Sequence, residues 1–246
     1  MQKIGFTSFQ LKMIALILMT VDHLPLLLGR EPFPYYHLVS GVSAALFAFV
    51  LTEGFFHTSS HSKYLIRLAA AAAVMSVGNR LITYITDAPA PLEYGMFASL
   101  AFGFAAMWVF QWARTKADVI EKKLIALAIA GIICILGMMY TDSGYAVIPV
   151  ILIGYFFHER KGWICLFTIV VSAVIAFNSI TYSASGNIQW DQFFGVDCQW
   201  SMAAVIFFIL LYSGRPGAQG GAAKWFFYLY YPLHIWAFCL VGMLAL

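Results

Sequence analysis

The sequence predicts an all-α fold, a polytopic bundle of transmembrane helices that forms a single domain over residues 1–246. Composition is the first reason, because 62% of the 246 residues are hydrophobic and only 10% are charged. Soluble domains carry about 25% charged residues, and 14 Lys and Arg with 11 Asp and Glu are too few to cover a soluble surface of this size. Long apolar stretches and a one-sided distribution of cations are the second and third reasons.

Apolar stretches close to the length of about 20 residues that a helix needs to cross a bilayer predict nine spans. The sixth stretch is short and the loop before it is tight, so eight or ten spans remain open alternatives. The stretches cover residues 9–29, 37–57, 64–85, 94–114, 121–140, 144–158, 162–180, 197–213 and 225–245.

The cations lie almost entirely in loops on one side of the predicted spans. When the N-terminus and the even-numbered loops share a side, only Arg30 and Arg80 lie toward the other side. The positive-inside rule then places the N-terminus in the cytoplasm and, with nine spans, the C-terminus outside. The cations on the cytoplasmic side are Lys3, Lys12, Lys63, Arg67, Arg114, Lys116, Lys122, Lys123, Arg160, Lys161, Arg215 and Lys224. Because they sit in short loops and not on one basic face, the net charge of +3 does not indicate a nucleic-acid partner.

Asp22 and His23 are the first ionisable residues expected inside the membrane, in the outer half of the first span. A charged group at that depth is costly, so it is expected to pair with another group or to serve a function. His23 beside a carboxylate has the components of a general base, because a neutral imidazole accepts a proton near neutral pH. Neighbouring residues on a helix point about 100° apart, so Asp22 could pair with a group other than His23, such as Arg80, which is expected at the same level beside Asn79. Arg80 could instead stabilise a developing oxyanion or an anionic substrate.

Three further ionisable residues lie in or near predicted spans. Glu53 lies near the end of the second span and Arg67 near the start of the third, so the two could pair across the cytoplasmic hairpin. His234 lies near the middle of the last span, just after Pro232, where a proline can free backbone carbonyls for a ligand. Hydrogen bonding of His234 to a neighbouring helix is the alternative.

Several segments together resemble the TraX family of conjugative-transfer membrane proteins. They are LKMIALILMTVDH at residues 11–23, LFAFVLTEGFFHTSSHSKYLIRL at 46–68, YTDSGYAVIPVILIGYFF at 140–157, LLYSGRPG at 210–217 and FFYLYYPLHIW at 226–236. The resemblance implies acetylation of the pilin N-terminus and a relation to transmembrane acyltransferases, which use a cytoplasmic thioester. By position, it points to Asp22, His23, Glu53, Arg67 and His234 as functional residues.

The expected function is therefore that of an integral membrane acetyltransferase in the bacterial inner membrane. The donor is acetyl-CoA, and the acceptor is a protein amine or a cell-envelope glycan at the outer side. His23 serves as the general base with Asp22, and Arg80, Asn79, Glu53 and His234 bind substrate or stabilise charge. The anionic end of CoA is expected to meet a cytoplasmic group of cations, which comprises Lys63, Arg67, Lys122 and Lys123.

The depth of His23 requires the acyl arm to enter the protein from the cytoplasm. We therefore expect a polar tunnel between the first, second, third and last spans, open inside for CoA and outside for the acceptor, with His234 lining its middle. Two alternatives remain, a proton-coupled transporter that uses the intramembrane His and acidic residues as a relay, and a non-catalytic assembly factor for pili or secretion. The sequence contains no phosphate-binding glycine motif and no metal-ligand spacing, and it leaves a homo-oligomer open.

Overall fold

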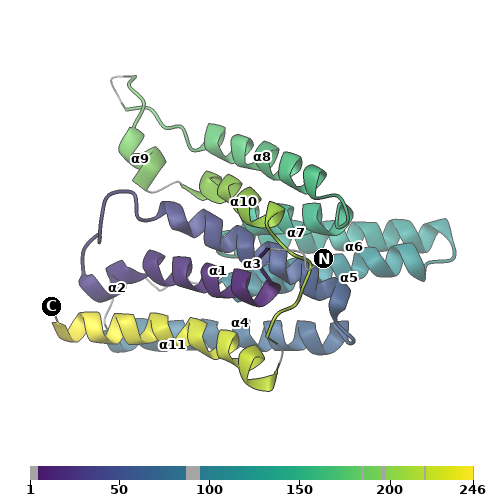
Figure 1. Ribbon diagram of the computed structural model, residues 1–246, viewed down its shortest axis with the longest axis horizontal. Coiled ribbons are helices and arrows are strands. Elements are labelled where there is room, and N and C mark those ends of the chain that lie inside the picture. Colours follow the sequence, from purple (N-terminus) through teal and green to yellow (C-terminus); the bar gives the residue numbers. More distant parts are fainter. Residues whose placement is uncertain (1–4, 87–94, 184–185, 196–197, 219, 246) are drawn as a thin grey trace.

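A computed structural model describes residues 5–86, 95–183, 186–195, 198–218 and 220–245, and these form a bundle of helices running along one common direction (Figure 1). Lys3, one of the predicted cytoplasmic cations, lies outside the described residues. The helices are α1 (Ser8–Asp22), α2 (Leu24–Leu28), α3 (Leu38–His57), α4 (His61–Thr86), α5 (Met96–Thr115), α6 (Ile120–Tyr140), α7 (Gly144–Phe156), α8 (Lys161–Asn178), α9 (Trp190–Gly195), the 3-10 helix η1 (Gln199–Ala204), α10 (Val205–Leu210) and α11 (Gly221–Ala245).

The helices match the predicted spans. Among the described residues, seven stretches are long and apolar enough to cross a membrane, and two shorter apolar helices, Gly144–Phe156 and Gln199–Leu210, occupy the sixth and eighth predicted positions. The prediction of a polytopic helical bundle is therefore confirmed. At 1.5 Å per residue, the 13 residues of α7 extend about 20 Å, and α7 packs in the interior against α3, α5 and α6.

Burial differs between the spans as expected for a bundle in lipid. The inner helix α3 buries most of its residues, including Leu46 and Phe55, whereas α4, α6 and α8 expose large apolar side chains. Ile66, Leu124 and Val170 are examples of these exposed side chains. Such surfaces are unfavourable in water and favourable against acyl chains, so these helices form the lipid-facing side of the bundle.

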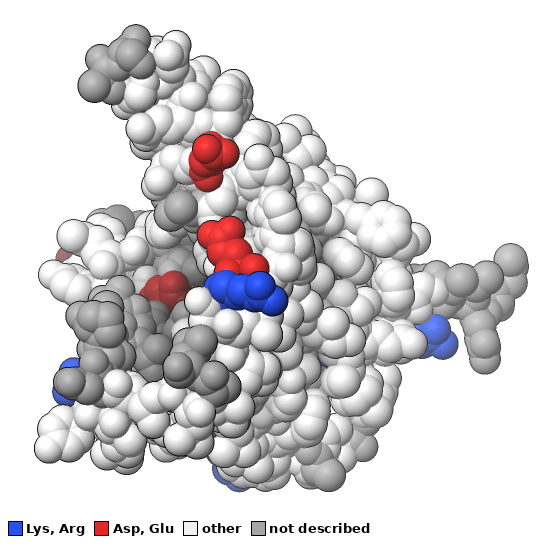
Figure 2. Space-filling model, turned by 90° about the vertical axis from the view of Figure 1, so that its left-hand side faces the viewer, with Lys and Arg blue, Asp and Glu red and all other residues white. Residues whose placement is uncertain are grey.

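The two ends of the bundle carry different charges. The turns between α3 and α4, α5 and α6, and α7 and α8 lie at the end from which α1 starts, and α11 finishes at the opposite end (Figure 1). We call the first the cation-rich end, because its turns and helix ends carry residues such as Lys63, Lys122 and Lys161. At the opposite, acidic end, Asp and Glu side chains gather around a hollow near the middle of the face (Figure 2). The described acidic residues of this end are Asp22, Glu31, Asp142 and Asp191. The assignment of the cation-rich end to the cytoplasm stays a prediction from the positive-inside rule.

Candidate functional site

A break in the first span positions Asp22 and His23. Pro25 has no backbone N–H, so it cannot continue the hydrogen-bond ladder of α1, and its ring disfavours regular helix in the preceding turn. Helix α1 accordingly ends at Asp22, and α2 restarts at Leu24 with Pro25 in its first turn. His23 lies between the two helices as the C-cap of one and the N-cap of the other. The proline thus places an acid and an imidazole at an interruption of the helix, close to the acidic end.

The imidazole of His23 pairs with that of His234 on α11. His23 Nδ1 lies 2.8 Å from His234 Nε2, and the two rings are stacked with centroids 5.1 Å apart. His234 Nδ1 lies 2.8 Å from the backbone oxygen of Tyr230. A carbonyl oxygen only accepts, so His234 Nδ1 carries the hydrogen. With both rings neutral, His234 Nε2 accepts from His23 Nδ1, and the lone pair of His23 is on Nε2.

Asp22 pairs with a histidine that the sequence analysis did not select. Its Oδ1 lies 2.5 Å from Nδ1 of His37, the residue that precedes α3. Asp22 thus pairs with a group other than His23, as its direction on the helix allowed, but that group is His37 and not Arg80. The loop between α2 and α3 brings His37 back to the level of Asp22. The hydrogen bond to Asp22 raises the pKa of His37 above the ordinary value of an imidazole, against the lowering effect of burial.

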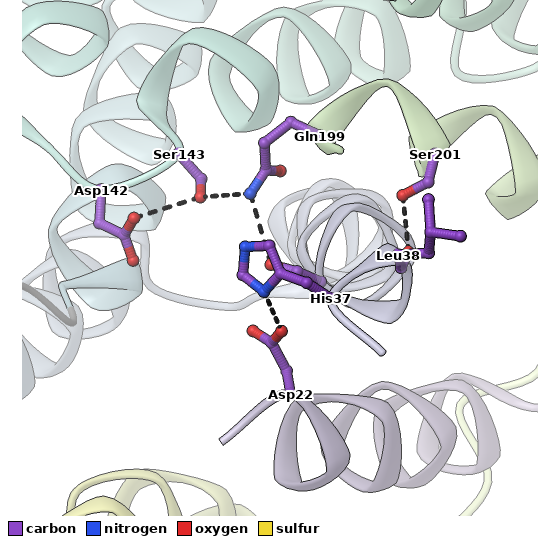
Figure 3. A network of polar contacts seen from close by, with 8 residues as sticks. Asp22, His37, Leu38, Asp142, Ser143, Gln199 and Ser201 are labelled. Carbon is purple, nitrogen blue, oxygen red and sulfur yellow. Dashed lines mark hydrogen bonds and ion pairs between the residues drawn. The ribbon is translucent and has the colours of Figure 1, made fainter. Parts of the chain in front are cut away.

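A chain of polar side chains lies on one side of the His37 ring, opposite Asp22 (Figure 3). Gln199 Nε2 donates to Ser143 Oγ at 3.1 Å, and Ser143 Oγ donates to Asp142 Oδ1 at 3.3 Å. The Gln199 amide also donates to Ser40 Oγ at 3.3 Å. Gln199 Oε1 is buried without a hydrogen-bond partner, so the chain has a vacant acceptor. Within the described residues, no three His, Cys, Asp or Glu side chains gather closely enough to hold a metal ion.

A cavity of about 600 Å³ opens between α1, α3, α4 and α11 and also reaches the start of α5. Its walls at the cation-rich end include Lys12, Arg67 and the segment that leads into α11, and its deeper walls include Met96 and Tyr231. The predicted tunnel is found only in part: a cavity lies between the first, second, third and last spans, but its lining ends at residues such as Met19 and Tyr231 and includes none of the acidic residues at the opposite end. His234 does not line it, contrary to the expectation.

Tyr231 separates the deep end of the cavity from the histidine pair. Its ring centroid lies 6.2 Å from that of His23 and 5.9 Å from that of His234. Phe97, which also lines the cavity, packs edge-on against Tyr231 at 5.1 Å. A molecule filling the cavity would therefore reach the histidine pair by displacing the Tyr231 ring.

Arg67 is held at the cavity by aromatic residues. Its guanidinium carbon lies 5.3 Å from the ring centroid of Tyr64, which is a cation–π geometry. Arg67 Nε is buried without a hydrogen-bond partner. Arg67 also lines the cavity. A guanidinium at a cavity wall is suited to an anionic ligand, because its planar set of donors matches carboxylate and phosphate oxygens.

Glu53 also lines the cavity, but it is not the partner of Arg67. Its Oε1 lies 3.2 Å from His158 Nε2. Burial raises the pKa of the neighbouring Tyr212 to about 12, and the carboxylate of Glu53 contributes to this rise. The predicted pairing of Glu53 with Arg67 is therefore corrected. His158 follows α7 and returns to the cation-rich end beside α3, which the order of the spans alone does not specify.

The predicted group of cations is divided by the structure. Arg67 lines the cavity, whereas Lys63 is exposed and does not. Lys122 and Lys123 lie on α6, which packs against α5 and α7 and borders no part of the cavity. Lys122 instead forms an ion pair of 2.7 Å with Asp118. Lys63, Lys122 and Lys123 therefore do not line the cavity with Arg67, whereas Lys12 of α1, which was not among the predicted site residues, does.

Asn79 and Arg80 are neighbours on α4 with different surroundings. Asn79 is buried and its Oδ1 accepts a hydrogen bond of 3.0 Å from Trp236 Nε1, which fixes α4 to α11. Arg80 is exposed on α4. The expected place of Arg80 beside Asp22 is therefore not observed, because the side chain of Arg80 projects to the surface and His37 occupies the position beside Asp22.

Comparisons with known proteins agree with this architecture. The model of the family described as TraX protein matches residues 8–242. The probable fimbrial assembly protein FimC, serogroup H1, of Dichelobacter nodosus is 26% identical over 258 aligned residues, which cover 98% of each chain. No solved structure matches. Since the family model covers both histidine pairs and the cavity, the chain belongs to the TraX protein family.

Proposed function

We propose that the protein is an integral membrane acetyltransferase of the bacterial inner membrane, with cytoplasmic acetyl-CoA as the donor. The cavity between α1, α3, α4 and α11 carries this proposal. It begins among cations at the end assigned to the cytoplasm and ends at Tyr231, next to His23. A CoA thioester has the complementary shape and charge, with phosphates at one end and the acyl group at the tip of a flexible arm. Lys12 and Arg67 would meet the phosphates while the arm extends toward Tyr231.

His23 is the proposed general base. The hydrogen bond to His234 holds its ring and favours the tautomer with a lone pair on Nε2. The acceptor heteroatom forms a bond to the acyl carbon, its proton passes to His23 Nε2, and the carbon–sulfur bond breaks with the electron pair on sulfur. The products are the acetylated acceptor and CoA thiol, which takes up the proton. In this scheme His234 replaces Asp22 as the residue that orients His23.

The acceptor is proposed to be a protein amine or a cell-envelope glycan at the acidic end. The relative in Dichelobacter nodosus is named a probable fimbrial assembly protein. This name supports a fimbrial protein as the acceptor. The same name supports a second candidate, a non-catalytic assembly factor. In that case the cavity would have no donor and His23 would contribute only to folding.

Incubation of the purified protein in detergent with labelled acetyl-CoA distinguishes the two candidates. The acetyltransferase is expected to bind acetyl-CoA saturably and to release CoA slowly with water as the only acceptor. Free acetate and CoA, separated from the protein, are measured over time, and heat-denatured protein gives the background. A folded protein that neither binds acetyl-CoA nor releases CoA would contradict the proposed function and favour the assembly factor.

A further inference from the structure

The His23–His234 pair and the Asp22–His37 pair favour opposite protonation states of their histidines. His23 is 4% exposed, and its partner is the imidazole of His234. Its pairing with another imidazole favours the neutral form that a base requires. His37 is paired with a carboxylate, and its side chain is 33% exposed. A carboxylate in hydrogen-bond contact and access to water both favour the imidazolium form. Two histidines held in different protonation states are a common arrangement of acid and base in active sites.

The groups that face His37 are mostly acidic. Asp22 on α1 makes the hydrogen bond, and Asp142 on the loop before α7 also favours the charged ring. His23 is the neighbouring base, close enough for its charge state and that of His37 to interact. Tyr36 precedes His37, and burial raises the pKa of its phenol, with Asp22 and Glu31 adding to the shift, so Tyr36 stays neutral. These groups favour a protonated His37 at neutral pH.

The backbone around this pair adopts conformations that L side chains rarely take. Tyr35, two residues before His37, has φ 60°, and Ser143, beside Asp142, has φ 53°. These are the positive-φ residues other than glycine among the described residues. Tyr35 lies in the loop that leads to His37, and Ser143 belongs to the polar chain beside it. Strained residues persist where surrounding structure holds them, and they concentrate at functional sites. The loop therefore holds His37 against Asp22 at a cost in backbone energy.

We propose that His37, held by Asp22 as an imidazolium, donates a hydrogen bond from Nε2 to the carbonyl oxygen of the acyl group during transfer. The inference rests on the proposed function and adds a catalytic residue to it. As the acceptor bonds to the acyl carbon, the electron pair of the carbonyl bond moves onto oxygen, where His37 stabilises the charge. When the carbon–sulfur bond breaks, the carbonyl bond re-forms, and His37 keeps its proton throughout. The acceptor proton goes to His23 and then to the CoA sulfur.

This assignment explains the position of Asp22 in the chain. Asp22 and His23 are consecutive in the chain. The residue whose carboxylate stabilises the imidazolium of His37 is therefore the direct neighbour of the residue that acts as the base. His37 thereby supplies the positive charge that the sequence analysis assigned to Arg80. Gln199, with its vacant Oε1, lies in the same polar chain and would accept a hydrogen bond from the acceptor.

The test measures CoA release from acetyl-CoA, with water as the acceptor, as a function of pH in detergent. His37 must be protonated, so the rate of CoA release is expected to fall as pH rises through the raised pKa of His37. This fall is the alkaline limb of the pH profile. His37→Ala should lower release about 10²- to 10³-fold, with acetyl-CoA binding within about twofold of wild type. His37→Gln, which keeps an N–H donor but does not titrate, should retain part of the rate and lose this alkaline limb. Asp22→Asn should move the limb to lower pH, and Asp191→Asn, an exposed acid at the same end, should not move it.

The outcomes separate the inference from the proposed function. If wild type releases no CoA, the proposed function fails, and the inference fails with it. If wild type releases CoA and His37→Ala does so equally fast, the inference alone is wrong. If Asp22→Asn leaves the alkaline limb of the pH profile at the same pH, the inference is also wrong. This test does not depend on whether His37→Ala folds. A purely structural pair would lower the rate of both variants without moving the limb.

Discussion

Replacement of His23 by alanine is expected to abolish acetyl transfer, with a loss of about 10²- to 10⁴-fold in rate, the usual contribution of a general base. Acetyl-CoA binding should persist, because the ring of Tyr231 lies between His23 and the cavity. Transfer of label and equilibrium binding of acetyl-CoA are measured on the same preparation. His61, a partly buried histidine at the cation-rich end outside the cavity, is the matched control for loss of an imidazole.

The split between rate and binding makes this result informative. A variant that folds, binds acetyl-CoA and fails to transfer has lost chemistry, whereas one that loses both has lost structure. Near-normal transfer by His23→Ala would exclude His23 from the mechanism. It would favour the second candidate, a non-catalytic assembly factor.

Charge reversal at the cavity is expected to raise the apparent KM for acetyl-CoA. Arg67→Glu and Lys12→Glu each replace an attraction for phosphate by repulsion. If this weakens donor binding by about 1.4 kcal/mol or more, the KM rises at least about tenfold. The effect on the turnover number should be smaller, because both residues contact the donor far from the reacting carbon. Initial rates over a range of acetyl-CoA concentrations measure both parameters.

Lys122→Glu and Lys123→Glu supply the control for this experiment. Both lysines lie on α6, away from the cavity, and carry the same charge at the same end of the bundle. Their reversal should leave the KM for acetyl-CoA unchanged. Equal effects at all four positions would mean that donor affinity follows the overall charge of this end and not binding in the cavity.

The spans could be predicted from the sequence because a helix in lipid satisfies its own backbone, so apolar length alone identifies it. The predicted stretches at residues 37–57 and 121–140 coincide with α3 and α6 almost to the residue. The break at His23 was not predicted, although Pro25 is a visible signal for it.

Which side chains pair inside the site depends on where the loops bring the chain back to the bundle. His37 is the first residue of the predicted second span, 37–57, but it was not counted among the ionisable residues at membrane depth. A hairpin of two spans nevertheless places the end of the first beside the start of the second, which is the signal that could have found it. Arg80 was predicted beside Asp22 from depth alone, but depth does not determine the direction of a side chain around a helix. Lys12 was counted only for its charge, although it lies on the same helix as His23 and lines the cavity.

The central claim is that the donor enters from the cytoplasm and that the acceptor receives the acetyl group at the other side. Membrane vesicles of both orientations test it directly, with labelled acetyl-CoA, which does not cross a bilayer, added outside. Inside-out vesicles that contain the protein should consume the donor at once, and right-side-out vesicles should do so only after permeabilisation. His23→Ala vesicles set the background. Consumption by intact right-side-out vesicles at the rate of inside-out ones would contradict a donor path through the cation-rich end.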